Sequence, residues 1–168
     1  MSTYEIVSTI VIVISIGINL YQFRARKPKL KIRLIRSLEP NVDGVGNYLC
    51  ARIFVSNHGG EAAYYGGLEA VDDKGNIFYP SCSLKAQNLI PPNASIVGVI
   101  PNGHLLCDGT KKLFVVDGTK KLFVVDGTLS KHKLSSINLR RTIKELKEER
   151  QRLESLGYKV HPNTSWLS

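Results

Sequence analysis

The chain has 168 residues and a formal net charge of +9 at pH 7. This length allows one domain plus an anchor and excludes two full catalytic domains, and a composition of 43% hydrophobic and 22% charged residues excludes a disordered chain. The charge is uneven, because residues 24–36 carry seven positive side chains and no negative one. The basic character therefore belongs to one short segment.

Residues 6–23 form an uncharged stretch rich in isoleucine and valine. The stretch is more than twice the length of a buried strand, so it predicts a transmembrane helix. Tyr4 at one end and Tyr21 with Phe23 at the other stand where aromatic rings settle at membrane interfaces. Positive charges follow the stretch and do not precede it. The positive-inside rule thus places the N-terminus outside and the rest of the chain in the cytoplasm, behind an uncleaved single-pass anchor in the cell membrane.

The basic segment consists of a linker and a strand. The linker, residues 24–28, ends at Pro28, which stops the membrane helix. Residues 29–36 begin with a strict alternation of basic and apolar side chains, which predicts a half-buried strand. Cations beside a bilayer attract anionic lipid headgroups by about 1 kcal/mol each. We expect such contacts from Arg24, Arg26, Lys27, Lys29, Lys31 and Arg33. Nucleic acid is the alternative partner, but the segment lacks the interleaved aromatic rings typical of that function.

Short alternating segments follow, separated by turns rich in Gly, Pro and Asn. We expect strands at residues 48–57, 63–71, 77–79 and 95–100, whereas residues 83–88 fit either a strand or one helical turn. In the first of these strands the core face is formed by Leu49, Ala51, Ile53 and Val55. Strands repeating every 8 to 12 residues predict an antiparallel β-sandwich.

The turn after residue 56 has the pattern Asn57-x-Gly59-x-x-Ala62. We expect Asn57 to cap the turn, Gly59 to supply a backbone angle that other residues resist, and Ala62 to begin the next strand against the core. The pattern resembles the N-x-G-x-x-A strand turn of bacterial immunoglobulin-like β-sandwich modules, which usually have proline where this chain has Glu61. The layout of anchor and small domain is similar to that of membrane proteins of SPbeta-type Bacillus prophages. The resemblance implies an immunoglobulin-like fold and names no activity.

Residues 108–116 and 117–125 are identical copies of DGTKKLFVV. The Asp117-Gly118 pair between them predicts a β-hairpin in which Leu113 faces Leu122. A solenoid needs about three repeats or more, so we interpret the pair as a duplication in an edge hairpin and not as a repeat-built binding surface.

A helix is predicted over residues 135–157, capped by Ser135 or Ser136 and ended by Gly157. One stripe of this helix is apolar, and we expect it either to pack on the sandwich or to dock on another protein or a second copy of the chain. The candidate partner contacts are Leu139, Ile143, Leu146 and Leu153.

The sequence contains no recognisable set of active-site residues. The nearest candidate is His58 with Glu61 in a glycine-rich turn, and a surface turn explains these two residues better than a catalytic role. The three cysteines, Cys50, Cys82 and Cys107, form no closely spaced pair and are typical of reduced packing thiols. No spacing indicates a metal site. We therefore predict no catalytic residue, metal or cofactor.

The sequence thus predicts a mainly β protein with an N-terminal transmembrane helix, an immunoglobulin-like antiparallel β-sandwich and a C-terminal α-helix. Its parts are an external N-terminus (1–5), the membrane helix (6–23), a basic linker (24–28), the sandwich (29–134), an amphipathic helix (135–157) and a tail (158–168). The predicted function is non-enzymatic, with the cytosolic sandwich as a protein-interaction module. The alternatives are a membrane-tethered nucleic-acid-binding protein and a small membrane-anchored hydrolase.

Overall fold

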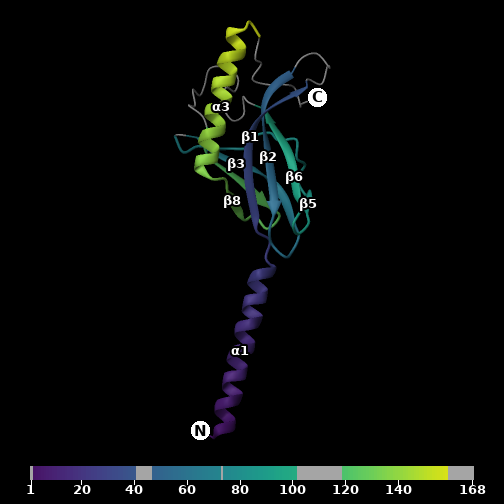
Figure 1. The fold of residues 1–168 in the computed structure, drawn as a ribbon, viewed down its shortest axis with the longest axis vertical. Coiled ribbons are helices and arrows are strands. Elements are labelled where there is room, and N and C mark those ends of the chain that lie inside the picture. Colours follow the sequence, from purple (N-terminus) through teal and green to yellow (C-terminus); the bar gives the residue numbers. More distant parts are fainter. Residues whose placement is uncertain (1, 41–46, 73, 102–118, 159–168) are drawn as a thin grey trace.

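The structure is a computed structural model that describes residues 2–40, 47–72, 74–101 and 119–158. A long helix at the N-terminus leads into two antiparallel sheets, and a second helix lies against them (Figure 1). The first helix, α1 (Thr3–Arg26), begins with a capping box in which Ser2 and Glu5 bond to each other's backbone. It ends before Pro28, as predicted. Within α1, Thr3–Phe23 is long and apolar enough to cross a membrane, and the other described residues bury none of it.

The first sheet has the strand order β1-β2-β6, with β1 at Leu30–Pro40, β2 at Asn47–Asn57 and β6 at Ser95–Pro101. Both pairs of neighbours are antiparallel. The four core residues predicted in β2 are all buried, and Leu34 of β1 is completely buried beside them. The period of two in the sequence therefore identified the inner face of this sheet.

The second sheet has the order β4-β3-β7-β8, and β5 pairs with β3 as well. Its strands are β3 (Ala63–Asp72), β4 (Ile77–Phe78), β5 (Leu89–Ile90), β7 (Thr119–Asp126) and β8 (Lys131–Lys133). Residues 83–88, expected to form either a strand or one helical turn, form neither a helix nor a strand. Apolar side chains of both sheets share one hydrophobic core, and those from the second sheet include Tyr65, Ala70, Leu122 and Val124.

Residues 119–125 of the second copy of the tandem repeat lie in β7. The first copy and the Asp117-Gly118 turn lie outside the described residues, and so does the predicted contact between Leu113 and Leu122. In β7, Leu122 pairs with Ala70 of β3, and its carbonyl accepts a hydrogen bond from the backbone N–H of Leu134. The described neighbours of β7 are therefore β3 and β8.

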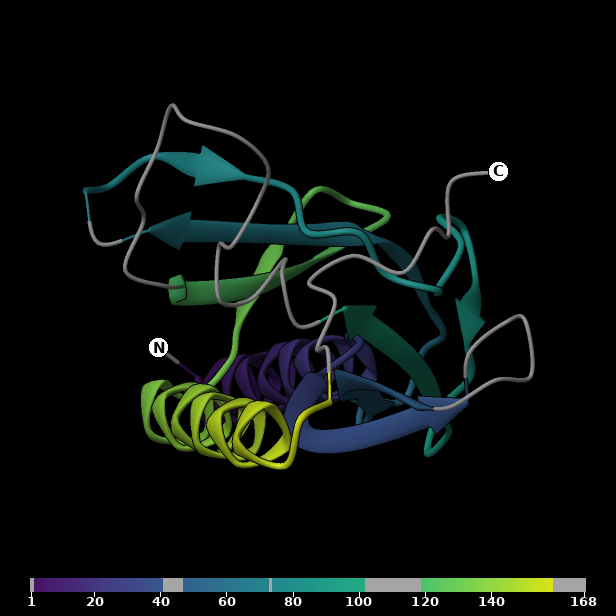
Figure 2. The ribbon, with the colours of Figure 1, turned by 90° about the horizontal axis from the view of Figure 1, so that it is seen from above.

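The second helix, α3 (Ser136–Ser155), packs along β1 and closes the core (Figure 2). Its predicted apolar stripe faces its own domain: Leu139 and Leu146 are fully buried, Ile143 packs against the core and Leu153 is half-buried. Of the two alternatives for this stripe, packing on the sandwich is the one found. Leu139 and Leu146 are core residues and are not available to a partner.

Hydrogen bonds join α3 to the free edge of β1. The side-chain oxygen of Asn138 accepts from the backbone N–H of Leu34 at 2.8 Å, and its amide group donates to the Leu34 carbonyl at 3.0 Å. Thr142 donates to the same carbonyl at 3.1 Å. Asn138 thus bonds as a neighbouring strand would, which protects an edge that otherwise invites pairing with another chain.

The end of α3 follows the sequence prediction. Gly157 has a φ of 84°, its N–H donates to the Glu154 carbonyl, and the N–H of Tyr158 donates to the Leu153 carbonyl. This pair of bonds is the Schellman motif, in which glycine adopts the left-handed conformation at low cost. On the same helix, Glu149 is buried and paired with Arg36 of β1 and with Arg152.

Candidate site at the helix-proximal end

The domain and α1 are joined by residues 27–29. From Arg26 to Leu30 this linker can span no more than about 14 Å, so the edge of the domain where β1 starts must lie close to the end of α1 (Figure 1). We call this edge the helix-proximal end. It comprises the linker 27–29 and three connections between strands, namely residues 57–62, 91–94 and 127–130.

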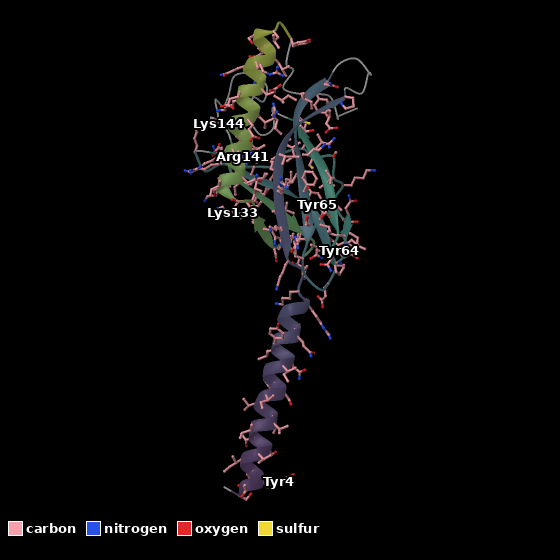
Figure 3. The ribbon with its side chains drawn as sticks, viewed as in Figure 1. Tyr4, Tyr64, Tyr65, Lys133, Arg141 and Lys144 are labelled. Carbon is pink, nitrogen blue, oxygen red and sulfur yellow. The ribbon has the colours of Figure 1, made fainter. Side chains whose placement is uncertain are left out.

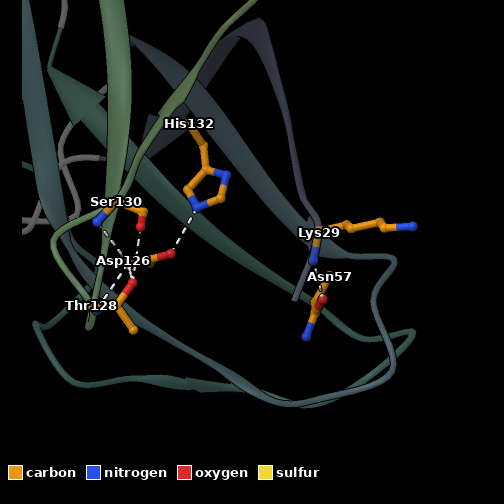
Figure 4. A network of polar contacts seen from close by, with 6 residues as sticks. All are labelled: Lys29, Asn57, Asp126, Thr128, Ser130 and His132. Carbon is orange, nitrogen blue, oxygen red and sulfur yellow. Dashed lines mark hydrogen bonds and ion pairs between the residues drawn. The ribbon is translucent and has the colours of Figure 1, made fainter. Parts of the chain in front are cut away.

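Asn57 is the hub of the helix-proximal end, and its side chain is completely buried. Its oxygen accepts from the backbone N–H groups of Lys29, at 3.2 Å, and Gly59, at 2.9 Å. Its amide group donates to the carbonyls of Glu61, at 2.6 Å, and Ile90, at 3.1 Å. The predicted capping role is confirmed by the bond from Gly59. The other bonds tie the linker, the turn and β5 together, and Figure 4 shows the one between Lys29 and Asn57.

Gly59 is needed here for a reason other than the predicted one. Its φ lies outside the left-handed region, so the predicted special backbone angle is wrong. A Cβ atom at this position would instead lie 2.2 Å from the carbonyl oxygen of Lys27 and 2.6 Å from the backbone nitrogen of Lys29. The linker passes directly over the turn, and the N–H of His58 donates to the Lys29 carbonyl at 2.9 Å. The linker is therefore packed against the domain.

The next strand, β3, begins at residue 63, as the expected range 63–71 has it, but Ala62 does not take the role predicted for it. Ala62 is exposed and precedes the strand, whereas Ala63 is buried and begins β3. Ala63 and Tyr65 point into the core because alternate residues of a strand share a face. The prediction that Ala62 meets the core is thus wrong.

The cations predicted to contact lipid gather along the linker and the outer face of β1. The side chains of Arg26, Lys27, Lys29, Lys31 and Arg33 are exposed, and that of Arg24 lies outside the described part. None of these five forms an ion pair with a described acidic residue. Lys27 Nζ lies 5.0 Å from the centre of the Phe23 ring, within the range of a cation–π contact.

The loop between β7 and β8 is organised by Asp126, whose role the sequence reading missed. One oxygen of this buried carboxylate accepts from the N–H groups of Thr128 and Ser130 and from the Thr128 hydroxyl, at 2.7 to 3.0 Å (Figure 4). The other lies 2.8 Å from Nε2 of His132. Burial opposes ionisation of Asp126, but the hydrogen bonds from His132, Thr128 and Ser130 outweigh it and lower its pKa. The sequence signal that could have predicted this turn is a Thr two residues and a Ser four residues after the Asp.

His58 and Glu61, the two residues that come nearest to a catalytic pair in the sequence, do not form such a pair in the structure. His58 and Glu61 are both exposed, and no hydrogen bond or ion pair joins their side chains. In the described part of the chain, no cluster of three or more His, Cys, Asp or Glu side chains is arranged to hold a metal ion. Cys50 and Cys82 are free thiols, and Cys107 lies outside the described residues.

Comparisons with protein-family models, with curated proteins and with solved structures find no match to this chain.

Proposed function

We propose that this chain is a single-pass membrane protein that holds a non-enzymatic, immunoglobulin-like β-sandwich against the cytoplasmic face of the cell membrane, where the domain binds another protein. The observation that carries the proposal is Thr3–Phe23, an apolar helix of 21 residues that no other described part of the chain covers. In water this segment would expose a continuous apolar surface, whereas in lipid a helix satisfies all of its backbone groups internally.

The orientation of the protein follows from its charges. The cations lie on the domain side of α1, and the positive-inside rule assigns that side to the cytoplasm. Exposed Arg26, Lys27, Lys29, Lys31 and Arg33, with no described acidic partner, fit contacts to anionic headgroups at about 1 kcal/mol each. These contacts would draw the helix-proximal end onto the lipid surface.

The strand order supports an immunoglobulin-like topology. The order β1-β2-β6 corresponds to strands A, B and E of that fold, and β4-β3-β7-β8 corresponds to strands C′, C, F and G. All neighbouring strands are antiparallel, as in that fold. Domains of this class present their loops and outer faces to other molecules, and the fold itself assigns no chemistry.

A protein contact is supported at the end of the domain that lies away from α1. Four large apolar side chains are exposed near that end: two on β4 and the residue after it, beside the turn that follows β3, and two directly after α3. They are Ile77, Tyr79, Leu156 and Tyr158. Aromatic residues are enriched in protein interfaces, because a rigid ring buries a large area at a small cost in conformational entropy.

Two experiments on the full chain in cells test the proposal. With a tag at each end, protease added to intact cells should remove the N-terminal tag and leave the C-terminal tag; removal of the C-terminal tag alone would refute the topology.

The protein contact is tested with a photoreactive phenylalanine in place of Tyr79, which is 73% exposed. The matched control carries the same group in place of Tyr64, which is 53% exposed at the helix-proximal end. We expect a discrete cross-linked protein from position 79 and not from position 64. Equal or absent products at both positions would contradict the proposed interaction surface.

A further inference from the structure

Leu129 is an anomaly in the loop between β7 and β8. It is 80% exposed and has a φ of 63°, a left-handed conformation that glycine and asparagine adopt readily and leucine does not. A single exposed leucine needs no explanation. An exposed leucine held in an unfavourable backbone conformation is different, because strain of this kind persists only where the surrounding contacts impose it and is enriched at functional sites.

The loop holds Leu129 in place. The N–H of Leu129 donates to the Asp126 carbonyl at 2.9 Å, and the N–H of Asp126 donates to the Ser130 carbonyl at 3.0 Å. The Asp126 carboxylate bonds to Thr128 and Ser130 on either side of the leucine. The leucine is therefore presented by a fixed turn.

The same loop belongs to the helix-proximal end of the domain. Asp126 pairs with Tyr65 near the start of β3, and the N–H of Gly127 donates to the carbonyl of Tyr64 at 2.8 Å. Tyr64 is itself exposed at that end (Figure 3). The turn at Gly59, which packs on the linker, leads directly into β3. The linker and the Leu129 loop thus share one end of a rigid body.

We propose that the loop at residues 127–130 is a second membrane contact, in which Leu129 enters the interfacial layer of the same bilayer that α1 crosses. This inference rests on the proposed function, since it requires α1 to span the membrane. Bilayer interfaces accept an apolar side chain at the boundary with the acyl chains while nearby lysines reach the phosphates. Two exposed lysines follow the loop on β8, namely Lys133 and Lys131, of which the latter also pairs with Glu69. Tyr64 supplies the kind of ring that settles at this depth.

The partner is therefore a phospholipid surface that contains anionic headgroups. The short linker restricts the helix-proximal end to the neighbourhood of the headgroups, and the cations around the loop complement their charge. With α1 as the first attachment and Leu129 as the second, the domain has one preferred tilt on the membrane.

The test uses the full chain in vesicles of phosphatidylglycerol and phosphatidylcholine, with and without bromine on the acyl chains. The chain has one tryptophan, so Trp166→Phe gives a silent background. Leu129→Trp then reports the loop. Ile137→Trp is the matched control, because Ile137 is 82% exposed but lies farther from the membrane. Its neighbour Asn138 bonds to Leu34, which is four residues along β1 from the end of the strand that faces the membrane. We expect brominated lipid to quench the indole fluorescence of the Leu129→Trp variant and to leave that of the Ile137→Trp variant unchanged.

Alkaline washing of the same vesicles, read together with the quenching result, separates the two ways in which the inference can fail. If alkaline washing removes the chain from the vesicles, α1 is not a membrane span and the proposed function fails. If the chain stays in the vesicles and the indole introduced by Leu129→Trp is not quenched, the second contact is refuted and the proposed function stands.

Leu129→Gly relieves the positive φ, so its urea midpoint in detergent should equal or exceed that of the wild type. A lower midpoint would show that Leu129 serves the fold and would overturn its assignment to lipid.

Discussion

Gly59→Ala should loosen the junction between α1 and the domain. The new methyl group would lie 2.2 Å from the Lys27 carbonyl oxygen, so the linker must move by about 1.2 Å before the two atoms reach ordinary contact. A movement of that size breaks the bond from Lys29 to Asn57, now 3.2 Å, and the bond from His58 to Lys29, now 2.9 Å. With about 1 kcal/mol for each of the two bonds and 1 to 3 kcal/mol for overpacking, the free energy of unfolding should fall by roughly 3 to 5 kcal/mol.

The assay is urea unfolding of the full chain in detergent, combined with hydrogen exchange of the backbone amides of Lys29, His58 and Gly59. Exchange at these amides should accelerate first, because the linker must leave the turn. Gly75→Ala is the matched control: Gly75 has a φ of 90° in a turn at the other end of β3, with no atom within 4 Å of the new methyl group. That variant should lose about 1 kcal/mol and keep slow exchange at the junction. An unchanged midpoint and unchanged exchange in Gly59→Ala would refute the close packing of the linker.

Three further predictions concern the domain. The pKa of Asp126 is lowered in the folded chain, so its ionised carboxylate stabilises the fold above the unfolded pKa of about 3.9, and this stabilisation is lost as the pH falls through the lowered pKa. The urea midpoint of Asp126→Asn should therefore fall less between pH 6 and pH 3 than that of the wild type. An equal fall in the two proteins would contradict this. Burial raises the pKa of Cys50 to about 12, so iodoacetamide at pH 8 should label Cys50 after unfolding and leave it unmodified in the native chain, as peptide mass spectrometry would report. Asn138→Ala leaves the buried N–H of Leu34 without its acceptor and should cost about 1 to 3 kcal/mol in the same urea assay, where a neutral result would exclude a role for this residue in closing the edge of β1.

The strands with a clear period of two were predictable from the sequence, and the short strand expected at residues 77–79 matches β4, whereas β5 and β8 were not predicted. Residues 48–57 and 95–100 match β2 and β6 closely, because one face of each is buried. The strand predicted at 29–36 extends to Pro40, because β2 pairs with β1 as far as Asn47. The two-residue strand β5 has no detectable period and exists because Ala63 and Tyr64 pair with it.

The candidate site was predictable only where its contacts are local. The bond from Gly59 to Asn57 joins residues two apart and has a turn signature. Glycine at position 59 fits two physical reasons, a special φ or a close approach, and the atoms that decide between them belong to Lys27 and Lys29. The pairing of Glu149 with Arg36 is also not predictable locally, because the two residues are 113 positions apart in the sequence.

The closure of β1 by α3 has a consequence for synthesis of the protein. Asn138 lies 104 residues after Leu34, so the ribosome has made most of the chain before the residue that covers this edge exists. Until then β1, which emerges directly behind α1, presents unpaired backbone groups to neighbouring nascent chains. Truncation before residue 138 should consequently yield a product that aggregates, and prompt completion of translation becomes a condition for correct folding.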